Sequence, residues 1–328
     1  MSVAAPGARP RRRRRRVDAA LLDRRELVGG ALPVLALAGM LIWAEALQSG
    51  ALAYDGLNLL LAPAIPLMLA AISQMFVIAV GDIDLGTGYL VGFVNVVAAR
   101  YLASDTLIAL ALFAGVVGAY ALQASIIHLR QIPSIIVTLG TSFVWLGLAL
   151  LVLPVPGGSA PDWLAGIFTA TPPVLALPIL VAIVLAALAY AISFLLPYGT
   201  VVRGAGSNAE AVGRNGWSLL KVRITCYALA AVFGLLAGLA VTGITASGDA
   251  NASGNYTLLA IAAVILGGGE FSGGRSVPFG AVIGALAISL VGSLLALLDV
   301  SSDYQTGAQG LVLIIVLAGR AVTRRIER

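Results

Sequence analysis

Long apolar runs, separated by short polar segments, make up most of this sequence. A helix that spans a bilayer needs about 20 apolar residues, and most of the runs approach that length. We predict ten spans, at residues 27–47, 62–80, 88–103, 106–127, 133–153, 173–196, 224–244, 257–268, 277–297 and 306–322. The eighth run is short and enters a glycine cluster, so we expect a broken or tilted helix there. The pattern indicates an all-α membrane protein with about ten transmembrane helices.

The basic residues support an even number of spans. If the N-terminus is cytoplasmic and the spans alternate, 19 of the 20 lysines and arginines lie on the cytoplasmic side, and only Arg100 lies outside. Without the N-terminal and C-terminal segments the count is still six against one. Cytoplasmic loops of membrane proteins carry such an excess. We therefore expect both termini on the cytoplasmic side of the membrane.

The first residues carry a tract of arginines, Arg11 to Arg16, ahead of the first apolar run. A cleavable signal peptide also begins with a basic segment, but run 27–47 is longer than a signal core and more spans follow. We predict an uncleaved first helix and three regions. These are a basic, disordered cytoplasmic tail at 1–26, a transmembrane domain at 27–322, and a cytoplasmic tail at 323–328.

Composition excludes several classes of protein. Of the 328 residues, 60% are hydrophobic and 11% are charged, against about 25% charged in soluble domains. The single cysteine, Cys226, cannot form an intrachain disulfide, and with the single histidine, His128, it cannot assemble a zinc site. We expect no bound metal. The net charge of +5 follows membrane topology, so no nucleic-acid partner is expected.

Two carboxylates follow the second span, in the segment Gly81–Gly88. Charge at membrane depth is costly and usually functional. Asp84 suits the N-cap of the next helix, which is one interpretation of this segment. The others are a proton or cation relay through Asp82 and Asp84, and a role in a solute pathway or gate.

Two further segments are too polar, or too rich in glycine, for simple connectors. In residues 197–223, Ser207 and Asn208 suit a helix N-cap, Glu210 a first turn and Gly216 a C-cap. A short surface helix is predicted, either a docking element or a solvated connector. Residues 267–275 superficially resemble a phosphate-binding loop but lack its Gly-Lys-Ser/Thr ending. We expect irregular backbone covered by protein there, and no nucleotide bound by this chain.

Glycines also lie within the spans. Gly115 and Gly118, Gly234 and Gly238, and Gly280 and Gly284 are spaced so that each pair occupies one helix face. Without a hydrophobic driving force between helices, small residues allow the close approach that holds membrane helices together. We interpret these glycines as packing positions.

Four motifs together resemble the permease subunits of bacterial ABC importers of the ribose/xylose/arabinose type. The family's Gly-Gly-Ile-Asp-Leu-Ser-x-Gly motif corresponds to Gly81–Gly88, and its Pro-x-(Ile/Phe)-(Ile/Val)-x-Thr-Leu-Gly-Thr segment to Pro133–Thr141. Its cytoplasmic Gly-Gly-Asn-Pro-Glu-Ala-Ala loop is matched by Gly206, Asn208, Glu210, Ala211 and Gly216. Its Ser-Gly-Gly-Arg motif is matched by Ser272, Gly273, Gly274, Arg275 and, five positions later, Gly280.

The resemblance covers about residues 55–320, with departures. Asp82 and Gly86 replace a glycine and a serine of the first motif, and Ala209 replaces the proline of the cytoplasmic loop. Gly269 and Glu270 replace small or hydroxylated residues before Ser272. The additional acids at 82 and 270 bear on gating and on the identity of the solute.

The resemblance implies an ABC importer permease fold of ten helices and a mechanism. Two permeases, as a homodimer or pseudo-dimer, form the pathway, and an extracytoplasmic binding protein delivers the solute. A separate ATPase subunit docks on Gly206, Asn208, Glu210, Ala211 and Gly216. It uses ATP and Mg²⁺, and its motion opens the pathway to alternate sides. Asp82, Asp84, Gly88, Ser272, Gly273, Gly274 and Arg275 are then gating or pathway residues.

The expected solute is a monosaccharide. Candidate polar residues along its path are Gln74, Asn95, Gln123, Thr138 and Thr141, which are also suited to hydrogen bonds between helices. Two alternatives stay open: an ABC permease for amino acids or nucleosides, and a secondary transporter driven by an ion gradient through Asp82 and Asp84. An enzyme is not expected, because no nucleophile–base pair is clustered in the sequence.

Overall fold

The computed structural model describes residues 33–301, 304, 305, 307, 308, 310, 311 and 314. These residues are helical, apart from their connections and an isolated β-bridge between Gly157 and Gly248. A helix at Pro33–Leu47 precedes α2 (Tyr54–Leu61), α3 (Ala64–Ala79), α4 (Thr87–Tyr101), α5 (Thr106–Arg130), α6 (Ser134–Val152), α7 (Asp162–Phe168), α8 (Leu177–Tyr190), a π-helical turn η1 (Ala191–Leu195), α9 (Pro197–Ser207), α10 (Ala209–Arg214), α11 (Leu219–Thr245), α12 (Tyr256–Leu266) and α13 (Pro278–Leu297).

Not every predicted span is a long helix. Among the described residues, five helices are long and apolar enough to cross a membrane, namely α5, α6, α8 with η1, α11 and α13. A sixth is obtained if α2 and α3, which meet at a bend of 50°, form one span. The short eighth run is confirmed as the 11-residue helix α12. The structure supports a multi-pass helical membrane protein, and the count of ten stays a prediction.

Parts of the sequence prediction lie outside the described residues. They are the N-terminal arginine tract, residues 27–32 of the first run, most of the tenth run and the tail at 323–328. The short helix predicted in the loop at 197–223 is confirmed as α10, which Asn208 caps. The same loop also holds α9, which was not predicted and in which Pro197 occupies the first turn.

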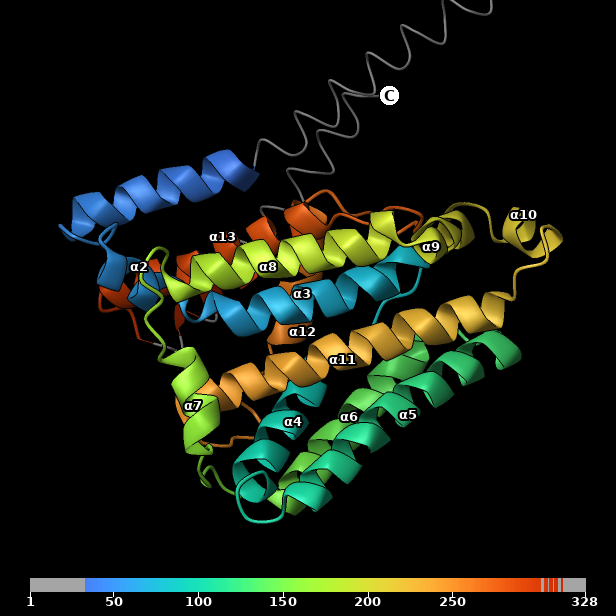
Figure 1. Ribbon diagram of the computed structural model, residues 1–328, viewed down its shortest axis with the longest axis horizontal. Coiled ribbons are helices and arrows are strands. Elements are labelled where there is room, and N and C mark those ends of the chain that lie inside the picture. Colours follow the sequence, from blue (N-terminus) through green and yellow to red (C-terminus); the bar gives the residue numbers. More distant parts are fainter. Residues whose placement is uncertain (1–32, 302–303, 306, 309, 312–313, 315–328) are drawn as a thin grey trace, which may run out of the picture.

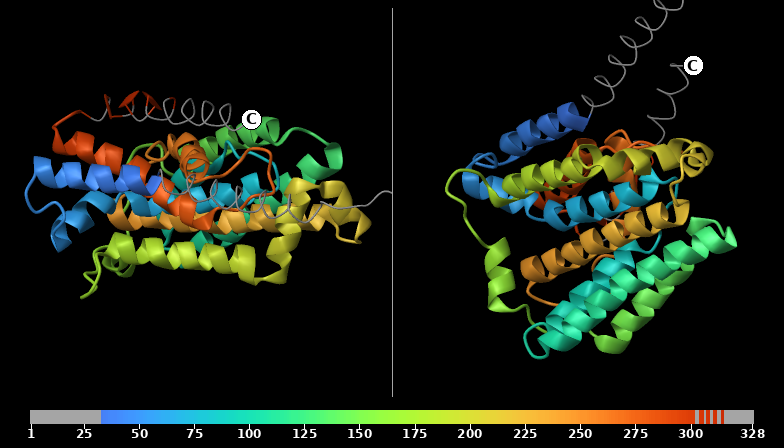
Figure 2. Two further views of the ribbon diagram at one scale, coloured as in Figure 1. Left: turned by 90° about the horizontal axis from the view of Figure 1, so that it is seen from above. Right: turned by 45° about the vertical axis from the view of Figure 1, so that its right-hand side comes forward.

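Helix α3 lies at the centre of the molecule. Its 16 residues include no charged side chain, and all are buried, as expected for a helix that is apolar on every face. In Figure 1, α8, α3 and α11 run side by side, while α5 and α6 lie together along another side. Figure 2 shows the same arrangement from two further directions. Exposed leucines, isoleucines and phenylalanines on α5 and α6 suit contact with lipid or another apolar surface.

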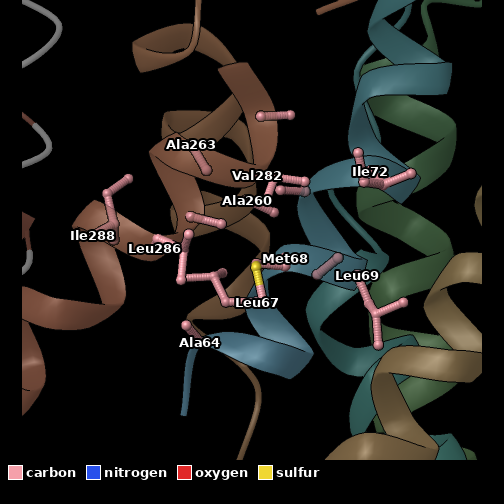
Figure 3. Packing of buried hydrophobic residues seen from close by; sticks show 14 of the residues in the cluster. Ala64, Leu67, Met68, Leu69, Ile72, Ala260, Ala263, Val282, Leu286 and Ile288 are labelled. Carbon is pink, nitrogen blue, oxygen red and sulfur yellow. The ribbon is translucent and has the colours of Figure 1, made fainter. Parts of the chain in front are cut away.

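The main core lies between α3, α12 and α13, as Figure 3 shows. Met68 and Ile72 of α3, Ala260 and Ala263 of α12 and Leu286 of α13 all belong to this core. The small side chains let the helix backbones approach closely. A Cβ atom added to Gly280 would lie 1.8 Å from the carbonyl oxygen of Gly267, and one added to Gly284 would lie 2.2 Å from that of Ala263.

The glycine prediction is confirmed for two of the three pairs. Gly234 and Gly238 of α11 pack against Leu90 and Val94 of α4, at distances that leave no room for a Cβ atom. Gly280 and Gly284 bring α13 onto α12 in the same way. For Gly115 and Gly118 the prediction was wrong within the described part of the chain, since nothing there beyond the neighbouring backbone of α5 lies within 4 Å of a Cβ atom built at either position.

The loops gather at two opposite ends of the molecule. At the α9/α10 end, on the right of Figure 1, Gly81, Gly206 and Gly273 lie against one another. At the α2/α7 end, the Tyr54 hydroxyl donates to the carbonyl of Pro172 at 2.7 Å, and the backbones of Gly157 and Gly248 pair. Segments 81–87, 197–223 and 269–276, which the basic residues assigned to one side of the membrane, therefore do share one end.

The contact between α12 and α13 gives a first prediction. Gly284→Ala should lower the thermal unfolding temperature of the purified protein, because overpacking typically costs about 1–3 kcal/mol. Gly115→Ala, in the middle of α5, is the matched control. It should leave stability unchanged or raise it, since alanine is the better helix former by about 1 kcal/mol. Equal effects of the two substitutions would contradict the packing described here.

Candidate functional site

The chain leaves the helical conformation between α3 and α4, at residues 80–86, and hydroxyl groups of other helices bind its backbone. The N–H of Ile83 donates to Ser134 Oγ at 3.1 Å, and that of Leu85 donates to Thr138 Oγ1 at 3.0 Å. The Thr138 hydroxyl donates in turn to the carbonyl of Ile83 at 3.2 Å. Ser134 and Thr138 are four residues apart on α6 and so share a face. The hydroxyls on this face hold residues 80–86, which we call the extended segment, inside the helix bundle.

Asp84 lies near the end of this segment, shortly before α4. Its Oδ1 accepts from the Gly86 N–H at 2.7 Å, and its Oδ2 accepts from the hydroxyls of Thr87 at 2.9 Å and Tyr120 at 2.7 Å. The carboxylate therefore binds groups at the start of α4. The N-cap of α4 is Gly86, so the interpretation of Asp84 as the cap itself was wrong. Gln74 of α3, with its amide turned to satisfy its neighbours, pairs with both the N–H and the C=O of Asp84 at 3.2 Å.

Asp82 is held by α11 instead. Arg223 Nε lies 2.9 Å from Asp82 Oδ2, and the Tyr227 hydroxyl donates to the same oxygen at 3.2 Å. The Asp82 side chain is only 7% exposed and that of Arg223 is 23% exposed. Arg223 and Tyr227 are four residues apart and so share one face of the helix. The ion pair joins the extended segment to the N-terminal part of α11. The distribution of basic residues predicts that this end of the helix faces the cytoplasm.

Four glycines from three motifs meet at the α9/α10 end, and we call this contact the glycine junction: Gly81, Gly206, Gly273 and Gly274. A Cβ atom on Gly206 would lie 2.0 Å from the carbonyl oxygen of Ala79 and 2.2 Å from the nitrogen of Gly274. Gly273 and Gly274 have positive φ angles of 78° and 79°, which glycine adopts without strain. The Gly274 N–H donates to the carbonyl of Ala79 at 2.9 Å. The junction thus fixes α9 directly on the end of α3.

Helix α10 stands next to this junction with its side chains exposed or half-buried. The Asn208 side chain accepts from the Ala211 N–H at 3.0 Å, which confirms an N-cap, and Gly216 has a φ of 84° just after the helix. Ser207 is not the cap. It ends α9, and its hydroxyl donates to the carbonyl of Arg203. Glu210 pairs with Arg214 one turn later, with both side chains about three-quarters exposed.

The fourth motif, which begins at Ser272, lies in the loop between α12 and α13. Arg275 lies 3.5 Å from Glu270, and the Ser272 hydroxyl donates to Glu270 at 3.4 Å. Gly269 is buried, while Ser272 is exposed. The predicted irregular backbone covered by protein is confirmed at the start of this loop. Glu270, an addition relative to the family pattern, therefore has its charge balanced within the loop.

Comparison with known proteins shows the family to which the chain belongs. Residues 57–317 match the family model described as branched-chain amino acid transport system / permease component. The chain belongs to this permease family. It is 32% identical to the "Probable ABC transporter permease protein YphD" of Escherichia coli (strain K12), over 79% of this chain and 80% of that one.

Two other relatives of the permease are named for a sugar. It is 31% identical to the ribose import permease protein RbsC of Bacillus subtilis (strain 168), over 76% of this chain and 79% of that one. It is 29% identical to the L-arabinose ABC transporter permease protein AraH of Azospirillum brasilense, over 75% and 74%. No solved structure matches the permease.

The polar residues predicted along a solute path mostly bind other parts of the permease. Asn95 donates to Thr242 at 3.0 Å and accepts from the Asp249 N–H at 2.7 Å, and Thr141 donates to Gln123 at 3.1 Å. Gln74 and Thr138 hold the extended segment. The Gln123 amide nitrogen is buried without a hydrogen-bond partner in the structure. These bonds fit the interhelical interpretation, and solute contact stays a prediction for all five.

Several residues of the site were missed at the sequence level. Ser134, Tyr120 and Tyr227 bind the extended segment. Thr257 does so as well, because its hydroxyl donates to the carbonyl of Leu85 at 3.4 Å and accepts from the Gly88 N–H at 2.8 Å. A signal existed for Arg223 and Tyr227, because two polar residues four apart at the end of an apolar run share a face. Their partner, Asp82, is 141 positions from Arg223 in the sequence, and only the folded chain shows the pairing.

Removing the Thr138 hydroxyl tests how the extended segment is held. Thr138→Val keeps the shape of the side chain but leaves the Leu85 N–H and the Ile83 C=O without their partner. An unsatisfied buried group costs about 1–3 kcal/mol, so the unfolding temperature should fall. Thr138→Ser should recover most of the loss. No rescue by serine would show that the methyl group, and not the hydroxyl, supports this position.

The ion pair with Asp82 can be tested by the same measurement. Arg223→Met leaves a buried carboxylate without its cation, a loss of about 1–3 kcal/mol. Asp82→Asn in the same protein should restore part of it. Arg214→Met breaks the exposed pair with Glu210 and serves as control, with an expected change within about 0.5 kcal/mol. Similar losses from both arginine substitutions would contradict a special role for the buried pair.

Proposed function

We propose that this permease is the membrane-spanning subunit of an ATP-driven importer of a monosaccharide. Its relatives named for ribose and arabinose support the solute class. The four sequence motifs shared with sugar permeases support the same class. The importer pairs two permeases, as a homodimer or pseudo-dimer, in the bacterial inner membrane. The permease itself makes and breaks no covalent bonds.

The geometry of α9 and α10 carries the proposal. A capped, exposed helix offers an outside protein a rigid surface, and Trp217 beside it is 48% exposed. At the same time, through the glycine junction, α9 packs directly against the end of α3 and the loop before α13, with no space for a Cβ atom between them. Close-packed contacts transmit displacement, because packed interfaces do not deform smoothly. A partner that moves α10 therefore moves the centre of the permease.

The partner proposed for this surface is an ATPase subunit. ATP and Mg²⁺ belong to that subunit, and no cofactor is assigned to the permease. The α9/α10 end then faces the cytoplasm, as do both chain termini, which agrees with the excess of basic residues in the loops gathered there. The α2/α7 end faces outward and receives the solute from a binding protein.

An ion-coupled transporter is the weaker candidate. It would need Asp82 or Asp84 to take up and release a cation during transport. Asp82 is balanced by Arg223, and Asp84 accepts three hydrogen bonds that order the start of α4. Carboxylates engaged in this way support the fold, and protonating either one would disturb it. The bonding of both residues therefore favours the ATP-driven mechanism.

Charge reversal on α10 tests the docking assignment. Glu210→Lys should reduce copurification of the ATPase subunit with the permease, while expression and unfolding temperature stay unchanged because the side chain is exposed. Asp162→Lys, at the exposed start of α7 at the opposite end, is the matched control and should retain the ATPase. If Glu210→Lys and further substitutions within 206–216 leave copurification intact, α10 is not the docking helix.

A further inference from the structure

A cavity of about 450 Å³ lies at the α2/α7 end, between α2, α3, α12 and α13. Its size is in the range of small-molecule sites, about 300–1,000 Å³. None of the residues predicted along the solute path lines it, and neither do the motif segments. It therefore needs an explanation of its own.

Two features of the sequence create this space. The helix of α2 and α3 bends by 50° at Pro63, which tilts the two parts away from each other. On α13, Ser289, Gly292, Ser293 and Ala296 share one face and present small side chains to the bend. Ser293 donates to the carbonyl of Leu60 at 2.7 Å and so fixes α13 against the bend.

Polar side chains line the cavity along with leucines. Ser289 is 9% exposed and Tyr256 is half-buried, and neither hydroxyl bonds to another described residue. Asn255 and Gln305 add amide groups. Buried hydroxyls normally have a hydrogen-bond partner. Neither hydroxyl is among the fully buried polar atoms that lack a partner, so both reach the surface of the cavity. With no partner among the described residues, both hydroxyls are available to a ligand in the cavity.

Comparison with another groove shows that polar lining residues are a particular feature of this cavity. It lies between the helix Pro33–Leu47, α8 and α13, and its volume is about 440 Å³. Every described residue that lines it is apolar, including Leu41, Ile183 and Phe279, which suits lipid chains. The cavity at the bend has nearly the same size but differs in its hydroxyl and amide groups. It is therefore suited to a polar molecule.

The absence of charged side chains among the described lining residues limits the kind of ligand further. Among its described lining residues there is no aspartate, glutamate, lysine, arginine or histidine. A zwitterionic amino acid would find no countercharge among these described residues, and burying its two charges there would be costly. An uncharged molecule with several hydroxyl groups bears no such cost. We infer that the cavity is a binding site for the transported solute, a neutral monosaccharide, on its way into the permease; this inference rests on the proposed function.

The site is connected to the glycine junction by the helices that form it. α3 runs from the bend at Pro63 to Ala79 at the junction, and α12 runs from Tyr256 to the loop that carries Gly273 and Gly274. α13 packs on α12 over the same length through Gly280 and Gly284. Movement of α9 at the junction therefore reaches the walls of the cavity through three close-packed helices.

Cysteine protection tests the site in the full importer. Cys226 is the only cysteine of the chain and is buried, so Cys226→Ala provides a cysteine-free background. In that background, Ser289→Cys should react with a small hydrophilic thiol reagent, and saturating D-ribose, D-xylose or L-arabinose should suppress the reaction. An equal concentration of L-leucine should not. Ala182→Cys, in the apolar groove, should not react with the hydrophilic reagent.

Uptake measured in the same preparations separates this inference from the proposed function. Tyr256→Phe and Ser289→Ala should each slow ATP-dependent uptake of the protecting sugar by about two- to tenfold, the loss of one neutral hydrogen bond. Normal uptake in both variants, with no protection of Ser289→Cys, overturns the site while the importer function stands. Protection by leucine instead of sugar overturns the solute class. If Ser289→Cys does not reach the membrane, Ala296→Cys in the same cavity replaces it.

Discussion

The structure depends on how it satisfies the backbone of residues 80–86. In a bilayer, non-helical backbone is tolerated only where protein or water binds its polar groups. Here Ser134 and Thr138 of α6 and Thr257 of α12 bind this backbone, and Asp84 binds the start of α4. Together these bonds join the segment to α4, α6 and α12. The break between α3 and α4 thereby fixes the relative positions of the central helices.

The same segment explains why distant motifs occur together in this family. The first and second motifs touch through the hydroxyls of α6, and the first, third and fourth meet at the glycine junction. Glycine is required there because backbones lie closer than any Cβ atom allows. The motifs are therefore parts of one contact surface that joins α9 and α10 to the core.

Sequence patterns predicted the helical class, the grouping of loops at one end, the cap at Asn208 and two of the glycine contacts. These features depend on local composition or on spacing along one helix, which a single sequence contains. The pairing of Asp82 with Arg223 and the cavity at Pro63 depend on which helix faces which. That information is spread over residues far apart in the chain. Helix α9, in the loop at 197–223, was missed because its apolar content is too low to mark a helix.

Uptake by proteoliposomes that contain the permease, its ATPase subunit and its binding protein tests the central claim most directly. Monosaccharide should accumulate inside vesicles when ATP and Mg²⁺ are supplied on the side of the α9/α10 end, and imposed proton or sodium gradients should have no effect. Accumulation that continues without ATP and stops when the ion gradient collapses would contradict this account.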